Sequence, residues 1–250
     1  MGALDDLKVA DFSWVGAGPR ATKDLADNGA MVIKIESRKR LDLGRMSPPF
    51  APAGRKNPDA SAFFAQSNTS KKSVTIDLTD PRGVEMAKSL VAWADVVVEN
   101  FGPGFMDRIG LGYEALKAIN PDIIYASVSV AGRSGPMAGF RGYGNSAAAQ
   151  SGHAAMSGWP DSEPHMPPFA YGDVVAPMFL TVAILAALEH RDRTGQGQHV
   201  DVSQIEPMVH VIADLFADPA LSGKPGNTHP LFAPHGVFPG LDPFGLRKFE

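Results

Sequence analysis

Lys8–Glu36, with the sequence KVADFSWVGAGPRATKDLADNGAMVIKIE, has the pattern of a strand, a glycine-rich turn, a helix and a second strand. The runs Lys8–Phe12 and Met31–Glu36 are rich in Val and Ile, which favours strands. Between them, Pro19 lies near the expected start of a helix and Gly29 just past its expected end. Two strands joined through a helix pair in parallel, so this stretch predicts the first unit of a parallel sheet.

The same alternation continues along the chain. Further strand-like runs occur at Ser73–Leu78, Asp95–Glu99, Ile123–Val130 and His199–Val202. Pro81–Trp93 has the pattern of a helix that Asp80 can cap, and another helix is predicted from Ile205 to about Ala217. Strands and helices that alternate in this way predict an α/β fold, a Rossmann-like parallel sheet flanked by helices.

Three segments depart from this alternation. Leu43–Ser70 is rich in Pro, Gly, Asn and Ser and predicts a long surface loop. The longest apolar run, Val174–Leu188, is interrupted by Pro177 and is short for a bilayer, so it predicts a buried helix and no membrane span. We expect residues 1–217 to form one large domain, and residues 218–250, rich in Pro and Gly, to be a linker and the start of an incomplete second domain.

The composition narrows the function. A net charge of -4 argues against a general nucleic-acid binder, because such proteins need a surplus of Lys and Arg. The absence of cysteine excludes disulfides, iron–sulfur clusters and a cysteine nucleophile, and the seven histidines show no metal-ligand spacing. The sequence has no Gly-x-Ser-x-Gly elbow, and its start lacks the pattern of an export signal. We therefore expect a cytoplasmic enzyme that holds no metal and binds neither nucleic acid nor membrane.

The turn Gly16–Ala21 matches a dinucleotide-binding fingerprint, with Glu36 in the place of the acidic residue that would bind the ribose. Pro19 removes one of the backbone N–H groups that such a site needs for the pyrophosphate, so the match is weak. Three basic residues at positions 38–40 follow Glu36 and favour a phosphorylated ribose. NADP and coenzyme A (CoA) both carry one, and this stretch alone does not separate them.

Several motifs further along resemble the family III CoA-transferases, the group that includes formyl-CoA and crotonobetainyl-CoA transferases. The motifs are Val97–Gly104, Asp107–Leu111, Asn120–Pro121, Gly172–Asp173, Thr194–Gln198 and Asp201–Ser203, and they occur in the family's order. The resemblance begins at Ala17-Gly18-Pro19, so it covers most of the chain. It implies the family's Rossmann-like large domain, an interlocked dimer, and CoA bound as a substrate with no permanently bound cofactor.

By this resemblance, Asp173 matches the family's catalytic aspartate. Without the resemblance, Asp173 is equally an N-cap for the helix predicted over Val174–Leu188. A carboxylate nucleophile suits acyl transfer, since attack on an acyl-CoA thioester gives a mixed anhydride that stays activated. The resemblance also implies oxyanion-stabilising N–H groups near Val15, Gly16 and Ala17.

The resemblance assigns further residues to the two ends of the substrate. Those expected to hold the nucleotide half of CoA are Arg38, Lys71, Asn100, Phe101 and Arg108. Those expected on the acyl side are Trp14, Arg141 and Tyr143. Trp14, together with Trp159 and Phe169, suggests a larger or more apolar acyl group. The expected function is transfer of CoA from an acyl-CoA donor to a carboxylic-acid acceptor, through an aspartyl anhydride and an aspartyl-CoA thioester.

Two other interpretations stay open. Acyl-CoA racemases share the family's fold and use a histidine as base, and this chain has Tyr143 at the matching position. The chain also stops before the family's C-terminal part, so an inactive fragment that acts only as a subunit is the second alternative. An active form is expected to be a homodimer, or to need a partner subunit that supplies the missing part.

Overall fold

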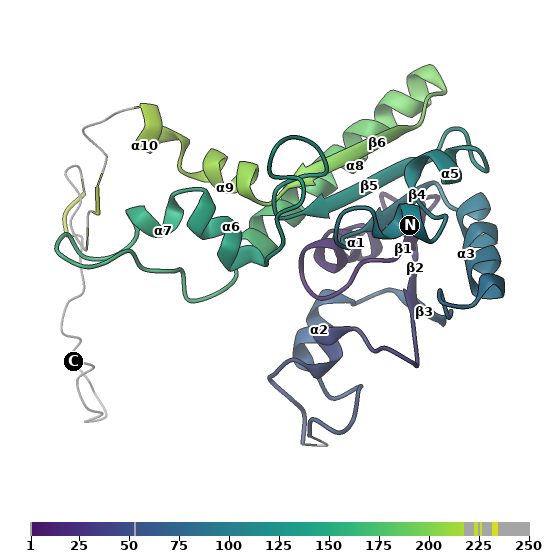
Figure 1. The fold of residues 1–250 in the computed structure, drawn as a ribbon, viewed down its shortest axis with the longest axis horizontal. Helices are drawn as coiled ribbons and strands as arrows, with labels where there is room; N and C mark the ends of the chain where they lie inside the picture. The colour runs from purple at the N-terminus through teal and green to yellow at the C-terminus, as the bar shows by residue number, and fades with distance from the viewer. Residues whose placement is uncertain (1, 53, 218–222, 225, 227–231, 235–250) are drawn as a thin grey trace.

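The computed structural model describes residues 2–52, 54–217, 223–224, 226 and 232–234. Within these residues it contains one six-stranded sheet in which every neighbouring pair of strands is parallel. The strands are β1 Lys8–Asp11, β2 Met31–Glu36, β3 Lys72–Thr75, β4 Val96–Glu99, β5 Ile124–Ser129 and β6 Gln198–Ser203. The prediction of an α/β fold with a parallel sheet flanked by helices is confirmed (Figure 1).

The strand order across the sheet is β3-β2-β1-β4-β5-β6. The chain starts in the middle of the sheet, builds outward to β3, and then returns to the middle to build outward to β6. The direction of building therefore reverses between β1 and β4, where Val9 pairs with Val96 and Asp11 with Val98. In open parallel sheets the loops at the carboxyl ends of such strands diverge and leave room for a ligand.

One face of the sheet is covered by α1 (Ala17–Asp27) and α8 (Gly172–Thr194). Because successive side chains of a strand point to opposite faces, Val9 and Val98 pack on this side together with Leu180 of α8. These residues are fully buried, and they fix the first turns of α1 and α8 near the carboxyl end of the sheet.

The opposite face is covered by α3 (Pro81–Trp93), α4 (Phe105–Arg108) and α5 (Tyr113–Lys117). The alternate strand residues Ala10 and Val97 point to this side. The two apolar layers enclose the sheet between them, which is why its central strands consist almost entirely of buried residues.

The predicted helix starts are only partly correct. Asp80 caps α3 as predicted, since its side chain accepts a hydrogen bond from the N–H of Arg82. Pro19, predicted at the first helical position, is the third residue of α1, which begins at Ala17. Pro19 still lies within the first turn, where a missing N–H removes no helical hydrogen bond.

The segment Leu43–Ser70 is not the structureless loop that its composition predicts. It contains a short 3-10 helix, η1 Leu43–Met46, and a helix, α2 Ala62–Ser67. Each begins at a side-chain cap, Asp42 for η1 and Ser61 for α2. Short capped turns of this kind lack the apolar periodicity by which a longer helix is recognised.

Helix α8 is longer than the apolar run that predicted it, because it continues through polar residues to Thr194. Its length and a mean hydropathy of 1.7 over its most apolar window would suffice to cross a membrane. Its inward residues, among them Leu180 and Ile184, are fully buried against the sheet and α1. Such contacts are those of a core helix, as the sequence predicts.

Four short helices lie past the carboxyl ends of β5 and β6 (Figure 1). They are α6 Gly144–Gln150, α7 His153–Met156, α9 Ile205–Val211 and α10 Ala213–Ala217. The single helix predicted from Ile205 to about Ala217 is broken at Ile212. Most of residues 218–250, the predicted linker and incomplete second domain, lies outside the described residues, so that division stays a prediction.

Candidate active site

A cavity of about 450 Å³, here called the transfer cavity, lies where the strand order reverses. Its walls are the backbone of residues 14–17 after β1, residues 100–103 after β4, the end of β5, and residues 140–143 before α6. The side chains of Asp173 and Gln204 line it as well. Segments far apart in the sequence thus meet at the carboxyl end of the sheet.

Asp173 is the second residue of α8 and faces this cavity. Its Oδ1 accepts a hydrogen bond of 2.7 Å from Nε2 of Gln204, and its Oδ2 accepts a longer one of 3.3 Å from the N–H of Gly144. Tyr171 stands at the N-cap position, so the interpretation of Asp173 as a helix cap is wrong. The carboxylate is held by neighbouring elements and leaves the end of its own helix uncapped.

Burial raises the pKa of the Asp173 carboxyl above its ordinary value. The hydrogen bonds from Gln204 and Gly144 and the positive charge of Arg20 oppose this effect without cancelling it. A desolvated carboxylate with few donors is a stronger nucleophile than one in water, because less solvation is lost on attack. The environment therefore suits covalent chemistry at this oxygen.

Replacing Gln204 with Ala is expected to raise the pKa of Asp173 further, since a donor to the charged form is lost. If the ionised carboxylate acts as a nucleophile, activity is lost as the pH falls through the raised pKa. The acid limb of the kcat profile should therefore move to higher pH in Gln204→Ala, and further in Gln204→Glu, where a second carboxyl adjoins the first. Gln150→Ala, an exposed residue of α6, is the control. Identical acid limbs in all four proteins would contradict the assignment.

Backbone donors face the same space. The N–H groups of Gly16 and Ala17 have no protein acceptor within the part of the chain that the structure describes, and both residues line the transfer cavity. They lie at the start of α1, where the helix dipole favours negative charge. A Cβ on Gly16 would lie 3.3 Å from Cγ of Asp173, so the missing side chain lets the carboxyl approach this turn. Both donors fit an oxyanion role beside Asp173.

The predicted oxyanion role does not extend to Val15. Its N–H donates to Oδ1 of Asp42 over 2.9 Å and is therefore occupied. Asn100, predicted to bind the nucleotide, instead binds the backbone of Trp14, the residue before Val15. Its amide oxygen accepts from the N–H of Trp14, and its amide nitrogen donates to the Trp14 carbonyl, each over 2.7 Å. The side chain of Asn100 also lines the transfer cavity, but its polar atoms are used within the protein.

A second cavity of about 410 Å³, here called the outer cavity, adjoins the first. Its apolar floor includes Phe12, Ile35 and Ile76. The residues that line both cavities are Trp14, Arg40, Phe101, Gly102 and Arg141. The guanidinium of Arg40 lies 5.7 Å from the ring centre of Trp14, and this ring meets that of Phe101 edge-on. An elongated ligand can therefore reach from the outer cavity past these rings to Asp173.

The basic residues predicted for the nucleotide divide into three groups. Arg108 lines the outer cavity as expected. Arg38 is exposed and lines neither cavity, whereas Arg40, two residues later, lines both. The structure contradicts a nucleotide contact for Lys71, because its ammonium group is buried and bound to Oδ2 of Asp11 at 2.9 Å.

The three residues predicted on the acyl side do meet in the transfer cavity. Tyr143 lines only this cavity and is 61% exposed, whereas Trp14 and Arg141 line both cavities. Trp159 and Phe169 line neither and are largely exposed, so they belong neither to these cavities nor to the core of the described chain. Of the three aromatic residues that suggested a larger acyl group, only Trp14 lines the transfer cavity.

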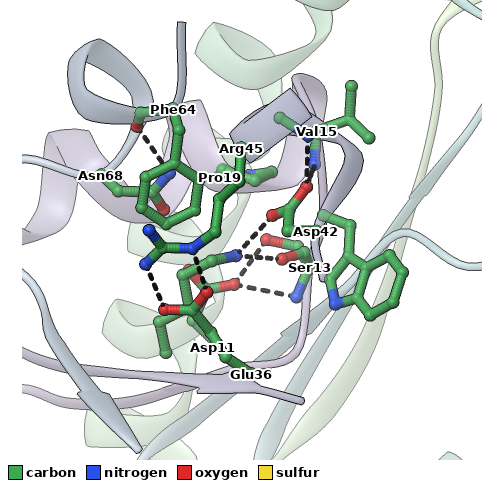
Figure 2. Close-up of polar contacts among 12 residues, drawn as sticks. Asp11, Ser13, Val15, Pro19, Glu36, Asp42, Arg45, Phe64 and Asn68 are labelled. Carbon is green, nitrogen blue, oxygen red and sulfur yellow. Dashed lines mark hydrogen bonds and ion pairs between the residues drawn. The ribbon is translucent and has the colours of Figure 1, made fainter. Parts of the chain in front are cut away.

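Beneath the transfer cavity lies a cluster of buried charges (Figure 2). It joins Asp11 to Lys71, and Lys34 to Asp42 at 3.1 Å, with every one of these side chains at most 2% exposed. Burial alone would raise the pKa of Asp11, but the ammonium groups of Lys71 and Lys34 and the hydroxyl groups beside it lower this pKa to about 2. Asp11 therefore stays ionised at neutral pH and keeps its ion pair with Lys71.

The sequence analysis misses Gln204 and Gly144, and it includes Arg40 only as one of the three basic residues at positions 38–40. Gln204 directly follows β6, and the carboxyl ends of parallel strands are where site residues gather, so its position is a usable signal. Gly144 shows no such signal: a Cβ there would lie 2.5 Å from the backbone nitrogen of Asp173, a contact visible only in the fold. Within the described residues, no group of three or more His, Asp or Glu could hold a metal ion.

The fold and the two cavities define an α/β protein with room for an elongated ligand, arginines along that path and a carboxylate beside backbone donors. The chain belongs to the family III CoA-transferases, whose model matches residues 4–244.

Two relatives show how far the likeness reaches. The chain is 36% identical over 246 residues to the succinate–glutarate CoA-transferase of Agrobacterium fabrum, covering 96% of this chain and 62% of that protein. It is 38% identical over 250 residues to the succinyl-CoA:mesaconate CoA-transferase of Haloarcula hispanica, covering 97% and 63%. The chain thus spans less than two thirds of the length of either relative.

Solved structures agree with this placement. A CaiB/BaiF family protein from Brucella suis superposes with a TM-score of 0.87 at 38% identity, covering 94% of this chain and 63% of that one. The protein Rv3272 from M. tuberculosis superposes with a TM-score of 0.79 at 35% identity, covering 86% and 59%. The described fold is therefore the corresponding part of a larger family structure.

Proposed function

We propose that this chain carries the CoA-binding and acyl-transfer site of an enzyme that moves CoA between carboxylic acids. The observation that carries the proposal is the position of Asp173: a partly buried carboxylate with a raised pKa lies in the transfer cavity against the free N–H groups of Gly16 and Ala17. The relatives named above act on succinate, glutarate and mesaconate, which favours small dicarboxylic acids as substrates here. Arg141, which lines the transfer cavity, supplies positive charge there for a second carboxylate.

The proposed cycle balances without an added proton, oxidant or reductant. An Oδ atom of Asp173 attacks the thioester carbonyl, the C–S bond breaks, and the CoA thiolate leaves with the electron pair while a mixed anhydride forms. The thiolate then attacks Cγ of Asp173, which releases the donor carboxylate and leaves an aspartyl-CoA thioester. An acceptor carboxylate attacks the same Cγ, expels the thiolate and forms a second mixed anhydride. The thiolate then attacks the acceptor's acyl carbon, which forms the new acyl-CoA and breaks the anhydride bond to restore the Asp173 carboxylate. Gly16 and Ala17 would stabilise each oxyanion in turn.

The two cavities suggest where each part of the CoA molecule binds. The outer cavity, with an apolar floor and Arg40, Arg108 and Arg141 among its lining residues, suits the adenine ring and its phosphates. The narrower passage past Trp14 and Phe101 suits the uncharged pantetheine arm. In this arrangement Arg40 takes the phosphate-binding role that the resemblance gives to Arg38.

CoA is expected to stabilise the chain against thermal unfolding by about 3 kcal/mol at one hundred times its Kd, because it binds only the folded state. This corresponds to a rise in Tm of roughly 5–10 °C for a domain of this size. NADP at the same concentration should have no effect. Stabilisation by NADP and none by CoA would refute the proposed ligand. Deuterium exchange at the α-carbon of an acyl-CoA without an acceptor acid would favour the racemase alternative instead.

The same melting assay separates the two arginines. Arg40→Ala should weaken CoA binding roughly tenfold, since one charge-assisted contact to phosphate is lost. Arg82→Ala is the charge-matched control, because Arg82 is 91% exposed on α3 and pairs with Asp80, its one acidic partner among the described residues. A larger loss in Arg38→Ala than in Arg40→Ala would favour the assignment from the resemblance.

The finer proposals on assembly rest on an uncovered surface of α8. Met178, Val182 and Leu185 lie at helical spacing and are 57%, 67% and 39% exposed. An apolar stripe of this kind is usually covered in the assembled protein. We propose that a second copy of the chain, or a subunit that carries the missing C-terminal part, covers it in a cytoplasmic enzyme. Sedimentation velocity tests this, and a monomer fully active in CoA transfer would contradict it.

A further inference from the structure

Val15 has a backbone conformation that its side chain disfavours. Its φ of 64° lies in the left-handed region, and Val15 and Ser70 are the non-glycine residues with positive φ in the part of the chain described. A β-branched side chain makes this conformation especially costly, so contacts around Val15 must hold it there. The next two residues, Gly16 and Ala17, carry the free N–H groups that face the transfer cavity.

Buried side chains hold the two residues before Val15. The N–H of Ser13 donates to Oδ1 of Asp11 over 2.9 Å, and the carbonyl of Ser13 accepts from Nζ of Lys34 over 2.6 Å. Asn100 then binds both backbone groups of Trp14. Four successive backbone groups after β1 are thus bound by side chains from β1, β2 and the end of β4, which leaves this turn little freedom.

Asp42 holds Val15 itself. Its Oδ1 accepts from the N–H of Val15 over 2.9 Å and from the N–H of Gly44 over 2.8 Å, while its Oδ2 pairs with Lys34 at 3.1 Å (Figure 2). The carboxylate is 2% exposed, so these contacts are shielded from water. Lys34 binds the Ser13 carbonyl as well, which couples the support of Val15 to that of Ser13.

We propose that Asp42 is a positioning residue that holds Val15 in its left-handed conformation and thereby aims the N–H groups of Gly16 and Ala17 at the acyl oxygen beside Asp173. The part of this inference that concerns the acyl oxygen rests on the proposed function. The part that concerns the backbone conformation of Val15 does not, because it involves only the turn. Asp42 does not line the transfer cavity, so it can act only through this turn, by its bond to Val15 and by its pair with Lys34, which binds Ser13.

The test compares Asp42→Ala in two backgrounds, the natural chain and Val15→Gly. Glycine adopts positive φ without a side-chain penalty, so it needs Asp42 less. In crystal structures of the variants, Val15 should leave the left-handed region in Asp42→Ala, and residue 15 should keep its positive φ in the double variant. For CoA transfer, Asp42→Ala in the natural chain should lower kcat about 10²-fold and leave the KM for acyl-CoA little changed. In the Val15→Gly background, the same replacement should lower kcat about tenfold or less.

Asp95→Ala is the matched control. Asp95 likewise accepts from a backbone N–H, that of Lys8, and pairs with a cation, Arg191, but it lies at the opposite end of the sheet. It should leave kcat unchanged in both backgrounds. If Asp42→Ala fails to fold because Lys34 is left without its counter-charge, the same comparison is made in a Lys34→Met background, where the buried charge is removed as well.

The outcomes separate cleanly. A purely structural Asp42 would lower Tm and lower kcat equally in both backgrounds, which would overturn the proposal. An unchanged φ of Val15 in the Asp42 variant would overturn it without any activity measurement. Absence of CoA transfer by the natural chain, together with the expected change in φ, would refute the proposed function and leave the conformational role of Asp42 in place.

Discussion

Replacing Asp173 with Asn is expected to lower kcat for CoA transfer by at least about 10⁴-fold, the scale seen when a covalent nucleophile is removed. The amide has nearly the shape of the carboxyl group but cannot form the anhydride. Its oxygen can still accept the 2.7 Å hydrogen bond from Gln204, and only the longer one from Gly144 is lost, so the fold and CoA binding should be preserved. The assay is the exchange of CoA between succinyl-CoA and a second dicarboxylate.

The same residue should be labelled directly. Incubation of the natural chain with acyl-CoA, followed by hydroxylamine, converts an aspartyl thioester to a hydroxamate at Asp173, and peptide mass spectrometry locates it. Label at another residue, or full activity in Asp173→Asn, would refute the covalent mechanism.

Asp24→Asn is the matched control for this experiment. Burial also raises the pKa of Asp24, but this residue lies on α1 and lines neither the transfer cavity nor the outer cavity. Its replacement should leave kcat unchanged and carry no effect on labelling. This result would show that a raised carboxyl pKa alone does not make an aspartate the nucleophile.

Asp11→Asn should lower the free energy of unfolding by about 3–5 kcal/mol, because it leaves the buried ammonium of Lys71 without its counter-charge. The amide oxygen can still accept from Ser13, so the loss reports mainly the ion pair. Urea unfolding at neutral pH measures it. A loss below about 1 kcal/mol, as for an exposed pair, would contradict the described burial of this cluster.

The double variant Asp11→Asn, Lys71→Met removes both charges and should be more stable than Asp11→Asn alone, with a coupling of about 1–3 kcal/mol. Asp95→Asn, which breaks the more exposed pair with Arg191, should cost about 1 kcal/mol or less. Additive losses in the double variant would show that Asp11 and Lys71 do not depend on one another.

The stability that the ionised Asp11 carboxylate contributes should depend on pH. The folded pKa of Asp11, about 2, lies below its ordinary value of 3.8. Its contribution to stability is therefore fully present above pH 3.8 and is lost as the pH falls toward 2. Asp11→Asn lacks this contribution at every pH, so the difference between the two proteins should shrink in that window.

Local pattern predicted much of the fold and one decisive residue. Runs of Val and Ile marked the strands, and their alternation with helices predicted a parallel sheet, because the core requires apolar faces at fixed periods. The order of motifs singled out Asp173, which local sequence alone describes equally well as a helix cap. Its place in a cavity beside Gly16 and Ala17 follows the general rule for the carboxyl ends of strands.

The sequence by itself therefore determined the sheet, the family and the candidate nucleophile, because each rests on local periodicity or on the order of motifs. Only the tertiary structure decided which groups are free to act. The ammonium group of Lys71 is paired with Asp11, 60 positions away, and the N–H of Val15 donates to Asp42. Arg40 lines both cavities, whereas Arg38 lines neither. Hydrogen bonds and ion pairs join residues by distance in space, and no local pattern records which partner will occupy a donor or a charge.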